Sequence, residues 1–271
     1  MKRFTLTITI GLILLISPAT FAQTVDFNQL AITDDATPEM RFSKKVELTA
    51  DALKKANERV VEMRDKLEEI SLEEETLEGQ LRDELVIRTQ EYSQFYDEQI
   101  KALKEAKAIE EVDTLIDTII SYREVVYSPG AREILEFILV YSYTPSVLDV
   151  ANQRLENIKR DVSKLERLKL VEPNSFTPSL ADAETVFQEA KDLHLQAAAL
   201  LIDNYSQSLL IEPTATSTDE VVTDTTPVEQ DTQLLITPKG LAEQSLTKIK
   251  TLYQLFMETG DRVTQSLGIG S

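Results

Sequence analysis

Few side chains in this sequence are of the types that perform chemistry, and the first to consider is the single histidine, His194. The chain contains no cysteine, so no zinc site can be built from histidine and cysteine ligands, and a Ser-His-Asp triad would depend on this one imidazole. The Glu-x-x-His pairs of di-iron bundles are also absent. Because His194 lies at helical spacing from Ala190 and Ala197, we interpret it as a partly buried structural residue.

A second candidate is the segment Ser245-Leu246-Thr247-Lys248, which matches the Ser-x-x-Lys pattern. In that pattern a lysine one helical turn away activates the serine, but the accompanying Ser-Asp-Asn and Lys-Thr-Gly segments are missing here. A pattern with two fixed positions often arises by chance. We therefore assign no catalytic role to Ser245.

Three carboxylates, Glu110, Asp113 and Asp117, are expected on one face of a helix. They could hold a Ca²⁺ ion loosely, but a straight helix does not wrap a cation as an EF-hand loop does, so a solvated face is favoured. The sequence also lacks the glycine-rich loops that bind phosphate. We therefore predict a non-enzymatic protein with no catalytic residue, no metal and no cofactor.

The composition favours helices and an acidic surface. Glycine and proline are scarce (7 and 9 of 271 residues), tryptophan is absent and aromatic residues make up 6%, which suits long helices rather than a twisted sheet. The formal net charge is −19, and loss of the first 22 residues would remove two basic and no acidic residues, leaving 26 against 47 and a charge of −21. Such a charge disfavours nucleic acid and anionic lipid as partners.

Residues 1–22 have the parts of a secretory signal: a basic start, an apolar stretch over 4–16 and a small-residue ending at Ala22. We predict cleavage after Ala22 and export to the periplasm or the exterior, with no disulfide as a stabiliser. The alternative is an uncleaved N-terminal membrane anchor, since residues 4–22 approach the length needed to cross a bilayer. No membrane span is expected after signal cleavage, because the next most apolar stretch, Ile134–Val140, is too short.

The longest pattern is a proline-free stretch that predicts one helix over about 38–127. Its apolar residues recur at alternating steps of three and four, as in a helix that buries a narrow face against another helix. A capping box at Ser71 and Glu74, with Gly79 nearby, would instead start a new helix, but the apolar spacing continues in register and favours continuity. The predicted interaction seam consists of Val46, Leu53, Val60, Met63, Leu67, Ile70, Leu77 and Leu81.

Five hydroxyl-proline pairs indicate helix starts, because the hydroxyl can cap a free amide and proline suits the first turn. They are Thr37-Pro38, Ser128-Pro129, Thr144-Pro145, Thr177-Pro178 and Thr237-Pro238. With the long helix they divide the chain into predicted segments. These are a flexible lead-in over 23–36, helices at about 38–127, 129–143, 145–171 and 178–211 that form a coiled-coil domain over 37–211, a disordered acidic Thr-rich linker over 212–237, and a C-terminal amphipathic helix and tail over 238–271.

The predicted fold is all-α without a sheet, with the long coiled-coil helix folded back on shorter antiparallel helices. The basic outer face of the 145–171 helix is opposite in charge to the acidic run over 68–78, which favours pairing of this helix with the long one. The shorter helices cannot cover the whole seam, so we expect an apolar stripe that binds a partner helix or a second copy. The predicted function is an exported structural or protein-interaction module of the cell envelope.

Two other functions are left open. One is a periplasmic holdase-type chaperone that grips unfolded chains between helices, which suppressed aggregation of a denatured client would indicate. The other is a helical-bundle sensor that binds a small ligand within an aromatic cluster, which a thermal shift with a metabolite library would indicate. Packing in a core is, however, the usual role of such a cluster. Its residues are Tyr122, Tyr127, Phe137 and Tyr141.

Overall fold

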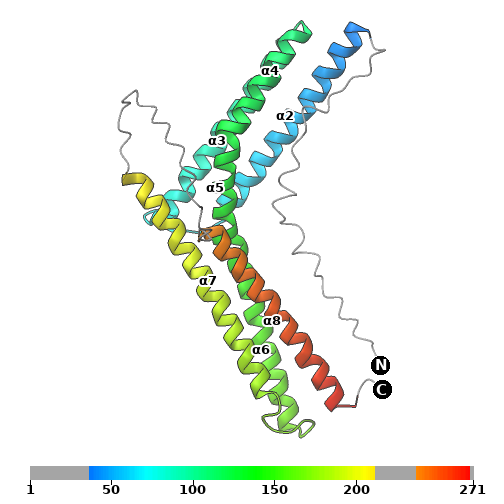
Figure 1. The fold of residues 1–271 in the computed structure, drawn as a ribbon, viewed down its shortest axis with the longest axis vertical. Helices are drawn as coiled ribbons and strands as arrows, with labels where there is room; N and C mark the ends of the chain where they lie inside the picture. Colours follow the sequence, from blue (N-terminus) through cyan, green and yellow to red (C-terminus); the bar gives the residue numbers. More distant parts are fainter. Residues whose placement is uncertain (1–36, 211–235, 269–271) are drawn as a thin grey trace, which may run out of the picture. The chain divides into compact units, whose positions relative to one another are not determined.

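The computed structural model describes residues 37–210 and 236–268, in which every regular element is helical (Figure 1). The prediction of an all-α fold without a sheet is therefore confirmed for these residues. The predicted signal, the lead-in and nearly all of the predicted linker lie outside them. In chain order the elements are α2 (Pro38–Glu68), α3 (Leu77–Glu105), α4 (Ile109–Tyr122), the π-helical turn η3 (Arg123–Tyr127), α5 (Ser128–Ile138), the π-helical turn η4 (Leu139–Tyr143), α6 (Thr144–Arg167), α7 (Thr177–Leu210) and α8 (Pro238–Ser266).

The chain is divided into two units. The first unit comprises Met1–Val61 and Glu91–Val126, and the second comprises Glu62–Gln90 and Tyr127–Ser271. The boundaries fall inside helices, so α2 and α3 each contribute one part to the first unit and another part to the second.

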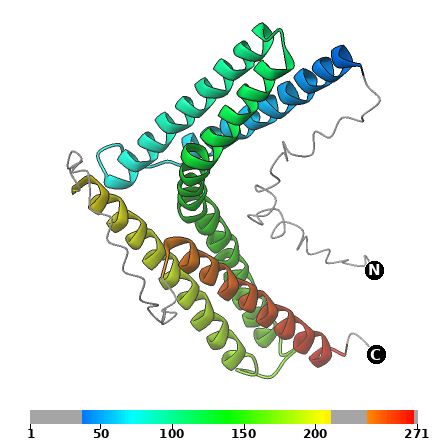
Figure 2. The same ribbon diagram turned by 45° about the horizontal axis from the view of Figure 1, so that its top comes forward.

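In the first unit, α4 and the adjoining parts of α2 and α3 lie side by side (Figures 1 and 2). Asn57 donates a hydrogen bond to Asp97 at 3.0 Å and accepts one from Ser93 at 2.7 Å, while Lys45 forms an ion pair with Asp113. One edge of each helix is apolar and buried. The buried side chains include Ala52, Leu53, Val60, Tyr92, Tyr96, Leu103, Val112, Ile116 and Ile119.

The prediction of one long N-terminal helix is wrong, because α2 ends at Glu68 and α3 begins only after Thr76. The Thr76 hydroxyl accepts a hydrogen bond from the Gly79 amide at 3.1 Å and donates one to the Glu73 carbonyl at 2.8 Å, which makes Thr76 the N-cap of α3. A Cβ at position 79 would lie 2.1 Å from the Glu73 carbonyl oxygen, so this turn requires glycine. A new helix does start in this region, but its cap is Thr76 rather than the predicted alternative, Ser71.

Side chains supply partners for backbone groups at both interruptions of the predicted helix. Arg82 donates to the carbonyls of Ile70 and Leu72, at 3.1 and 3.2 Å, and so supplies a partner for two oxygens of the segment that connects α2 to α3. The second interruption separates α3 from α4, and there the Glu111 carboxylate accepts a hydrogen bond from the Lys107 amide at 2.7 Å. Polar contacts therefore stabilise each break, and the spacing of apolar residues in the sequence gives no sign of them.

Two of the hydroxyl-proline pairs do not start helices. Pro129 and Pro145 lie inside one helical run, Ile109–Arg167, and each follows a π-helical turn. Proline lacks an amide hydrogen and its ring crowds the preceding turn of an α-helix, and the wider π-helical turn makes room for the ring. The Thr144 hydroxyl donates to the Leu139 carbonyl at 2.8 Å, which restores one hydrogen bond. The predicted separate helices starting at these prolines are therefore wrong.

The other three pairs lie at helix starts, as predicted. The Thr37 hydroxyl accepts a hydrogen bond from the Met40 amide at 3.3 Å, and the Thr237 hydroxyl accepts one from the Gly240 amide at 3.0 Å. Thr177 is the first residue of α7. A hydroxyl before proline therefore marks a helix start only where the chain upstream of it is not already helical.

In the second unit, α6, α7 and α8 pack together (Figure 2). The Ser245 hydroxyl of α8 donates to the Ala190 carbonyl of α7 at 2.7 Å, a close approach that small side chains on both helices allow. Lys159 of α6 forms an ion pair with Glu184 of α7, and α6 packs with α7 and α8 rather than with the long helix as predicted. The shared core consists of Leu148, Ala151, Leu155, Ala183, Ala190, Ile249, Leu252 and Phe256.

Candidate functional site

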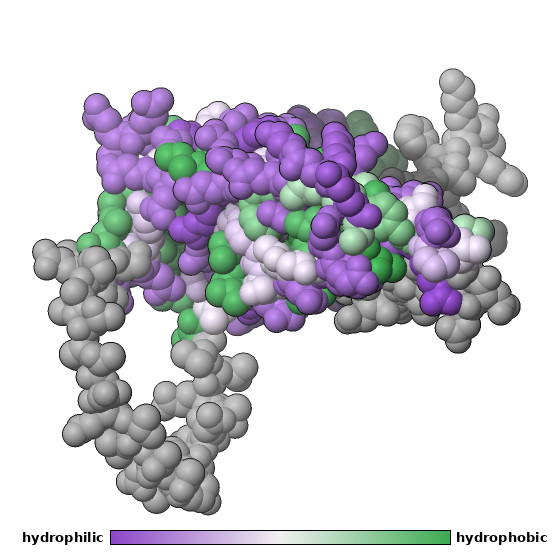
Figure 3. Space-filling model, turned by 90° about the horizontal axis from the view of Figure 1, so that it is seen from above, coloured by the Kyte–Doolittle hydropathy of each residue, from purple (hydrophilic) through white to green (hydrophobic). Residues whose placement is uncertain are grey.

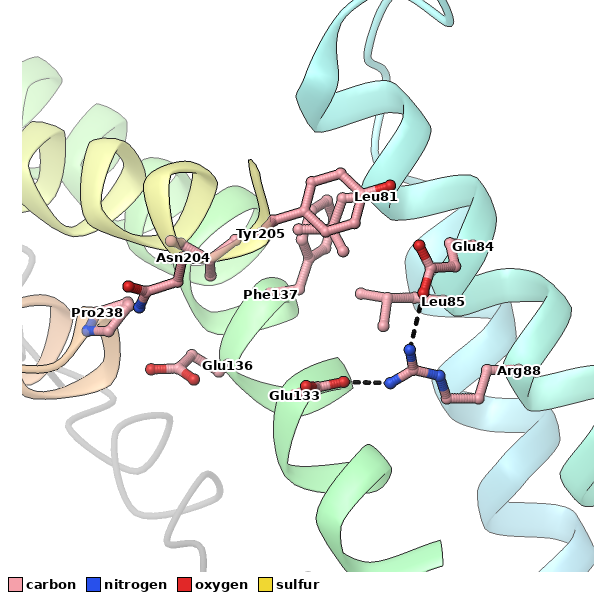
Figure 4. Close-up of a pocket in the computed structure, with 11 residues that line it drawn as sticks. Leu81, Glu84, Leu85, Arg88, Glu133, Glu136, Phe137, Asn204, Tyr205 and Pro238 are labelled. Atoms are coloured by element: carbon pink, nitrogen blue, oxygen red, sulfur yellow. Dashed lines mark hydrogen bonds and ion pairs between the residues drawn. The ribbon is translucent and has the colours of Figure 1, made fainter. Parts of the chain in front are cut away.

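A cleft of about 220 Å³ lies in the second unit between α3, α5, α7 and the start of α8 (Figure 4). Its apolar wall is formed by Leu81, Leu85, Phe137 and Leu201. Its polar side chains come from three helices, each of which contributes a pair. These are Glu84 and Arg88 from α3, Glu133 and Glu136 from α5, and Asn204 and Tyr205 from α7.

Arg88 links two walls of the cleft. Its guanidinium pairs with Glu84, one helical turn earlier, at 2.9 Å and also with Glu133 on α5 (Figure 4). Tyr205 is hydrogen-bonded to Glu84, and burial, followed by this bond and the charge of Glu84, raises the pKa of Tyr205 above its ordinary value. Tyr205 is therefore protonated at neutral pH and acts as a hydrogen-bond donor rather than as a general base.

Glu136 closes the cleft at the first turn of α8. Its carboxylate accepts a hydrogen bond of 2.6 Å from the Lys239 amide, while Thr237 caps the next amide of the same turn. Negative charge is favourable at this position because the N-terminus of a helix carries a partial positive charge. Glu136 thus attaches α8 to α5 through a contact between residues 103 positions apart.

The charges and dimensions of the cleft limit what it can do. Three glutamates and one arginine give it a formal charge of −2, and Arg88 is already engaged by two of the carboxylates. The free lone pairs of Glu133 and Glu136 can accept hydrogen bonds from a cationic donor. Small-molecule sites usually occupy about 300–1,000 Å³, so only a small ligand would fit. The lining supplies acceptors and an apolar wall but no serine, cysteine or histidine nucleophile.

The side chains proposed for chemistry from the sequence have structural partners. Ser245 is buried and donates to the Ala190 carbonyl, and Lys248 forms an ion pair with Glu189 at 2.7 Å. The geometry of a serine activated by this lysine is therefore absent. His194 is half-buried, its Nδ1 has no hydrogen-bond partner among the described residues, and burial lowers its pKa. The interpretation of His194 as a partly buried helix residue is confirmed.

The three carboxylates considered for a cation lie on the surface of α4. Glu110, Asp113 and Asp117 are exposed on α4, and Asp113 pairs with Lys45. Across the described ranges, no group of histidine, aspartate and glutamate side chains is arranged to hold a metal ion.

The residues of the predicted aromatic cluster are divided between the two units, with Tyr122 in the first and Tyr127, Phe137 and Tyr141 in the second. In the first unit, Tyr122 stacks on Phe95 with ring centroids 3.5 Å apart and meets Tyr92 edge-on. In the second unit, Phe137 packs against Tyr141 at 4.7 Å. The rings in the first unit are part of a helical core, and of the predicted cluster only Phe137 reaches the cleft.

The predicted interaction seam is largely hidden within the chain. Val46 is half-buried and Leu77 is 39% exposed, but the other six residues are buried. The prediction that this stripe remains free as a contact surface is therefore wrong, because the chain folds back twice and covers it. On the face drawn in Figure 3, hydrophilic side chains predominate and hydrophobic ones occupy small areas between them. The six buried seam residues are Leu53, Val60, Met63, Leu67, Ile70 and Leu81.

Sequence reasoning did not find the cleft. Glu84 and Arg88 are an ordinary pair one helical turn apart, and nothing in the sequence brings Glu133 or Tyr205 to them. The pairing depends on which helices become neighbours, and that information is tertiary. No protein-family model, curated protein or solved structure matches this chain.

Proposed function

We propose that this chain is an exported, non-enzymatic protein-interaction module that binds a helix of its partner along the helical run Ile109–Arg167. The observation that carries the proposal is the incomplete burial of this run. It contains a window of 18 residues that is apolar enough to cross a membrane by length and composition, yet only 33% of the window is buried. Apolar helix surface left open in this way is typical of sites that bind another protein or a membrane.

The open surface follows a regular edge. Leu135, Leu139 and Tyr143 are four residues apart and each is half-buried, whereas the next residue in this row, Val147, packs against the core of the second unit. Side chains at this spacing form the kind of ridge that enters the groove of another helix. A membrane span is disfavoured, because Leu148 of the same run is buried in the core shared with α7 and α8. We therefore favour a helical protein partner for this edge.

The test uses the absence of cysteine from the chain. Leu139→Cys carries the only thiol and can be labelled with a photoreactive maleimide. We expect irradiation to give a discrete cross-linked product, either twice the mass of the chain if the partner is a second copy or another defined mass in the envelope of the producing cell. The matched control is Leu195→Cys, on a 55% exposed position of α7.

The outcomes separate clearly. Cross-linking from Leu139→Cys but not from Leu195→Cys supports the proposal and gives the mass of the partner. Absence of a discrete product from the purified chain and from the intact envelope would refute it. Equal products from both positions would indicate random collisions and would also refute it.

The cleft supports a second candidate function, the binding of a small amine. The observation is the excess of carboxylates over the single guanidinium beside an apolar wall. We expect a short alkyl diamine to raise the unfolding temperature and a diol of equal length to leave it unchanged. Glu133→Gln should reduce the shift, whereas Glu189→Gln, which removes a carboxylate outside the cleft, should not. A shift that is equal for diamine and diol would exclude this candidate.

A further inference from the structure

The turn between α6 and α7 carries exposed leucines. Leu168 is 68% exposed and Leu170 is 50% exposed, and they alternate with Arg167 and Lys169 in the order Arg-Leu-Lys-Leu. All four side chains are exposed. The segment therefore presents two large apolar and two basic side chains to the surroundings within four consecutive residues.

The backbone of this turn is fixed by hydrogen bonds. The Lys169 amide donates to the Glu166 carbonyl at 2.9 Å and the Leu170 amide to the Leu165 carbonyl at 3.0 Å, which is the Schellman arrangement at the end of a helix. Lys169 has a φ of 57°, the left-handed conformation in which glycine is usual. An apolar residue at position 170 often packs on position 165 in this motif, but Leu168 has no such structural role.

Other side chains of the turn pack in a buried cluster with neighbouring helices. Val171 and Phe176 are buried in a cluster with Val162 of α6. Arg262 of α8 lies over the Phe176 ring at 5.5 Å and donates to Ser179 at 2.5 Å. The core of this end of the helical packing is therefore complete without Leu168 and Leu170. Neither leucine belongs to this buried cluster, and Leu168 is the more exposed of the two.

The basic side chains of the turn are available to a ligand. No ion pair involves Arg167 or Lys169 among the described residues, whereas Lys164, one turn earlier, pairs with Asp161. The carboxylate of Glu166 is occupied by the Asn174 amide at 2.9 Å. Glu172 is exposed nearby and reduces the local positive charge. Arg167 and Lys169 therefore present exposed basic side chains, while the carboxylates of Glu166 and Glu172 bring the formal charge of residues 166–172 to zero in a chain of net charge −19.

We propose that the α6–α7 turn is a membrane-contact site, in which Leu168 and Leu170 enter the headgroup region of a phospholipid bilayer and Arg167 and Lys169 bind lipid phosphates. The chemistry of the four side chains fits this ligand, because leucine favours the apolar boundary and long basic side chains reach back to the headgroups. The acidic remainder of the chain is repelled by an anionic surface. This repulsion lowers the overall affinity for an anionic surface, in line with the acidic composition, and it orients the chain so that contact is made through this turn.

The first test uses the absence of tryptophan from the chain. Leu168→Trp introduces a single reporter, and Leu195→Trp on α7 is the matched control at a comparably exposed leucine. Both are made in the chain lacking residues 1–22, since a secretory signal would itself bind lipid. The probe is a vesicle of phosphatidylcholine and phosphatidylglycerol in equal parts. We expect a blue shift and quenching by brominated lipid for Leu168→Trp only.

The second test removes each interaction in turn. Leu168→Ser with Leu170→Ser, and Arg167→Gln with Lys169→Gln, should each reduce vesicle co-sedimentation several-fold, while Leu195→Ser should leave it unchanged. High salt should weaken binding of the wild-type chain, and soluble phosphate should not compete. No blue shift on the vesicles, or an equal effect at Leu195, would overturn the proposal. Circular dichroism confirms that each variant is folded.

Discussion

The clearest test of the fold concerns Gly79, where helix propensity and a close backbone contact within the turn before α3 predict opposite effects of the same substitution. Alanine is favoured over glycine inside a helix by about 1 kcal/mol, so Gly79→Ala would stabilise α3 if propensity decided. A Cβ at this position, however, would lie 2.1 Å from the Glu73 carbonyl oxygen. The oxygen would have to move by about 1 Å to reach an ordinary contact distance.

The magnitude follows from the bonds that this movement breaks. The Glu73 carbonyl accepts hydrogen bonds from the Thr76 amide at 3.1 Å and the Thr76 hydroxyl at 2.8 Å. Each contributes about 0.5–1.5 kcal/mol, so their joint loss of about 1–3 kcal/mol equals or exceeds the gain in propensity of about 1 kcal/mol. We expect Gly79→Ala to destabilise the protein by up to about 2 kcal/mol. The midpoint of thermal unfolding should then fall by up to about 4–8 °C.

The chain offers a matched control in Gly260. This glycine lies within α8, and a Cβ there would meet no atom within 4 Å. We expect Gly260→Ala to stabilise the protein by about 0.5–1 kcal/mol. Urea unfolding followed by circular dichroism measures both variants. Stabilisation by Gly79→Ala similar to that by Gly260→Ala would refute the close contact at the start of α3.

Three further predictions concern single contacts. Glu136→Ala should destabilise the protein by about 0.5–2 kcal/mol in urea unfolding, because it removes a cap of α8, and an unchanged midpoint would contradict the attachment of α8 to α5. Burial, followed by the charge of Glu78, raises the pKa of Tyr141. The stability linked to its protonated form is therefore complete below about pH 10 and is lost as the pH rises further, so Tyr141→Phe should lose less stability than the wild-type chain in urea unfolding at alkaline pH. Burial lowers the pKa of His194, so its contribution is present above about pH 6.5 and is lost as the pH falls. The single imidazole signal in an NMR titration should report this lowered pKa, and an ordinary value would contradict the burial of His194.

Much of the fold followed from the sequence. The scarcity of glycine and proline and the spacing of apolar residues predicted helices, and they placed α7 and α8 close to their observed bounds. Thr37 and Thr237 marked helix starts correctly, since a cap needs only the three residues that follow it. Most of the predicted seam positions are apolar and buried, as a narrow helix face requires. These features depend on residues close together in the chain.

The errors arose where a distant or geometric contact decides the outcome. The break before α3 depends on how near the Glu73 carbonyl comes to Gly79, and spacing alone does not reveal that distance. Pro145 is accommodated within a helix because a π-helical turn precedes it, an adjustment that leaves the residue pattern unchanged. The sequence predicts more exposed apolar surface along the seam than the structure has, because an unbroken helix could not fold back and bury its own apolar face, whereas the interrupted helix does.

The sequence by itself determined the helical composition, the acidic charge and most of the positions that are buried. These properties follow from side-chain chemistry and from periodicity within single helices. The tertiary structure decided which helices are neighbours, and hence that Glu84, Arg88, Glu133 and Tyr205 meet in one cleft while Leu168 and Leu170 stay exposed on a supported turn. The physical reason is that a helix face only requires burial, whereas the choice of partner depends on turns whose geometry is fixed by individual backbone contacts.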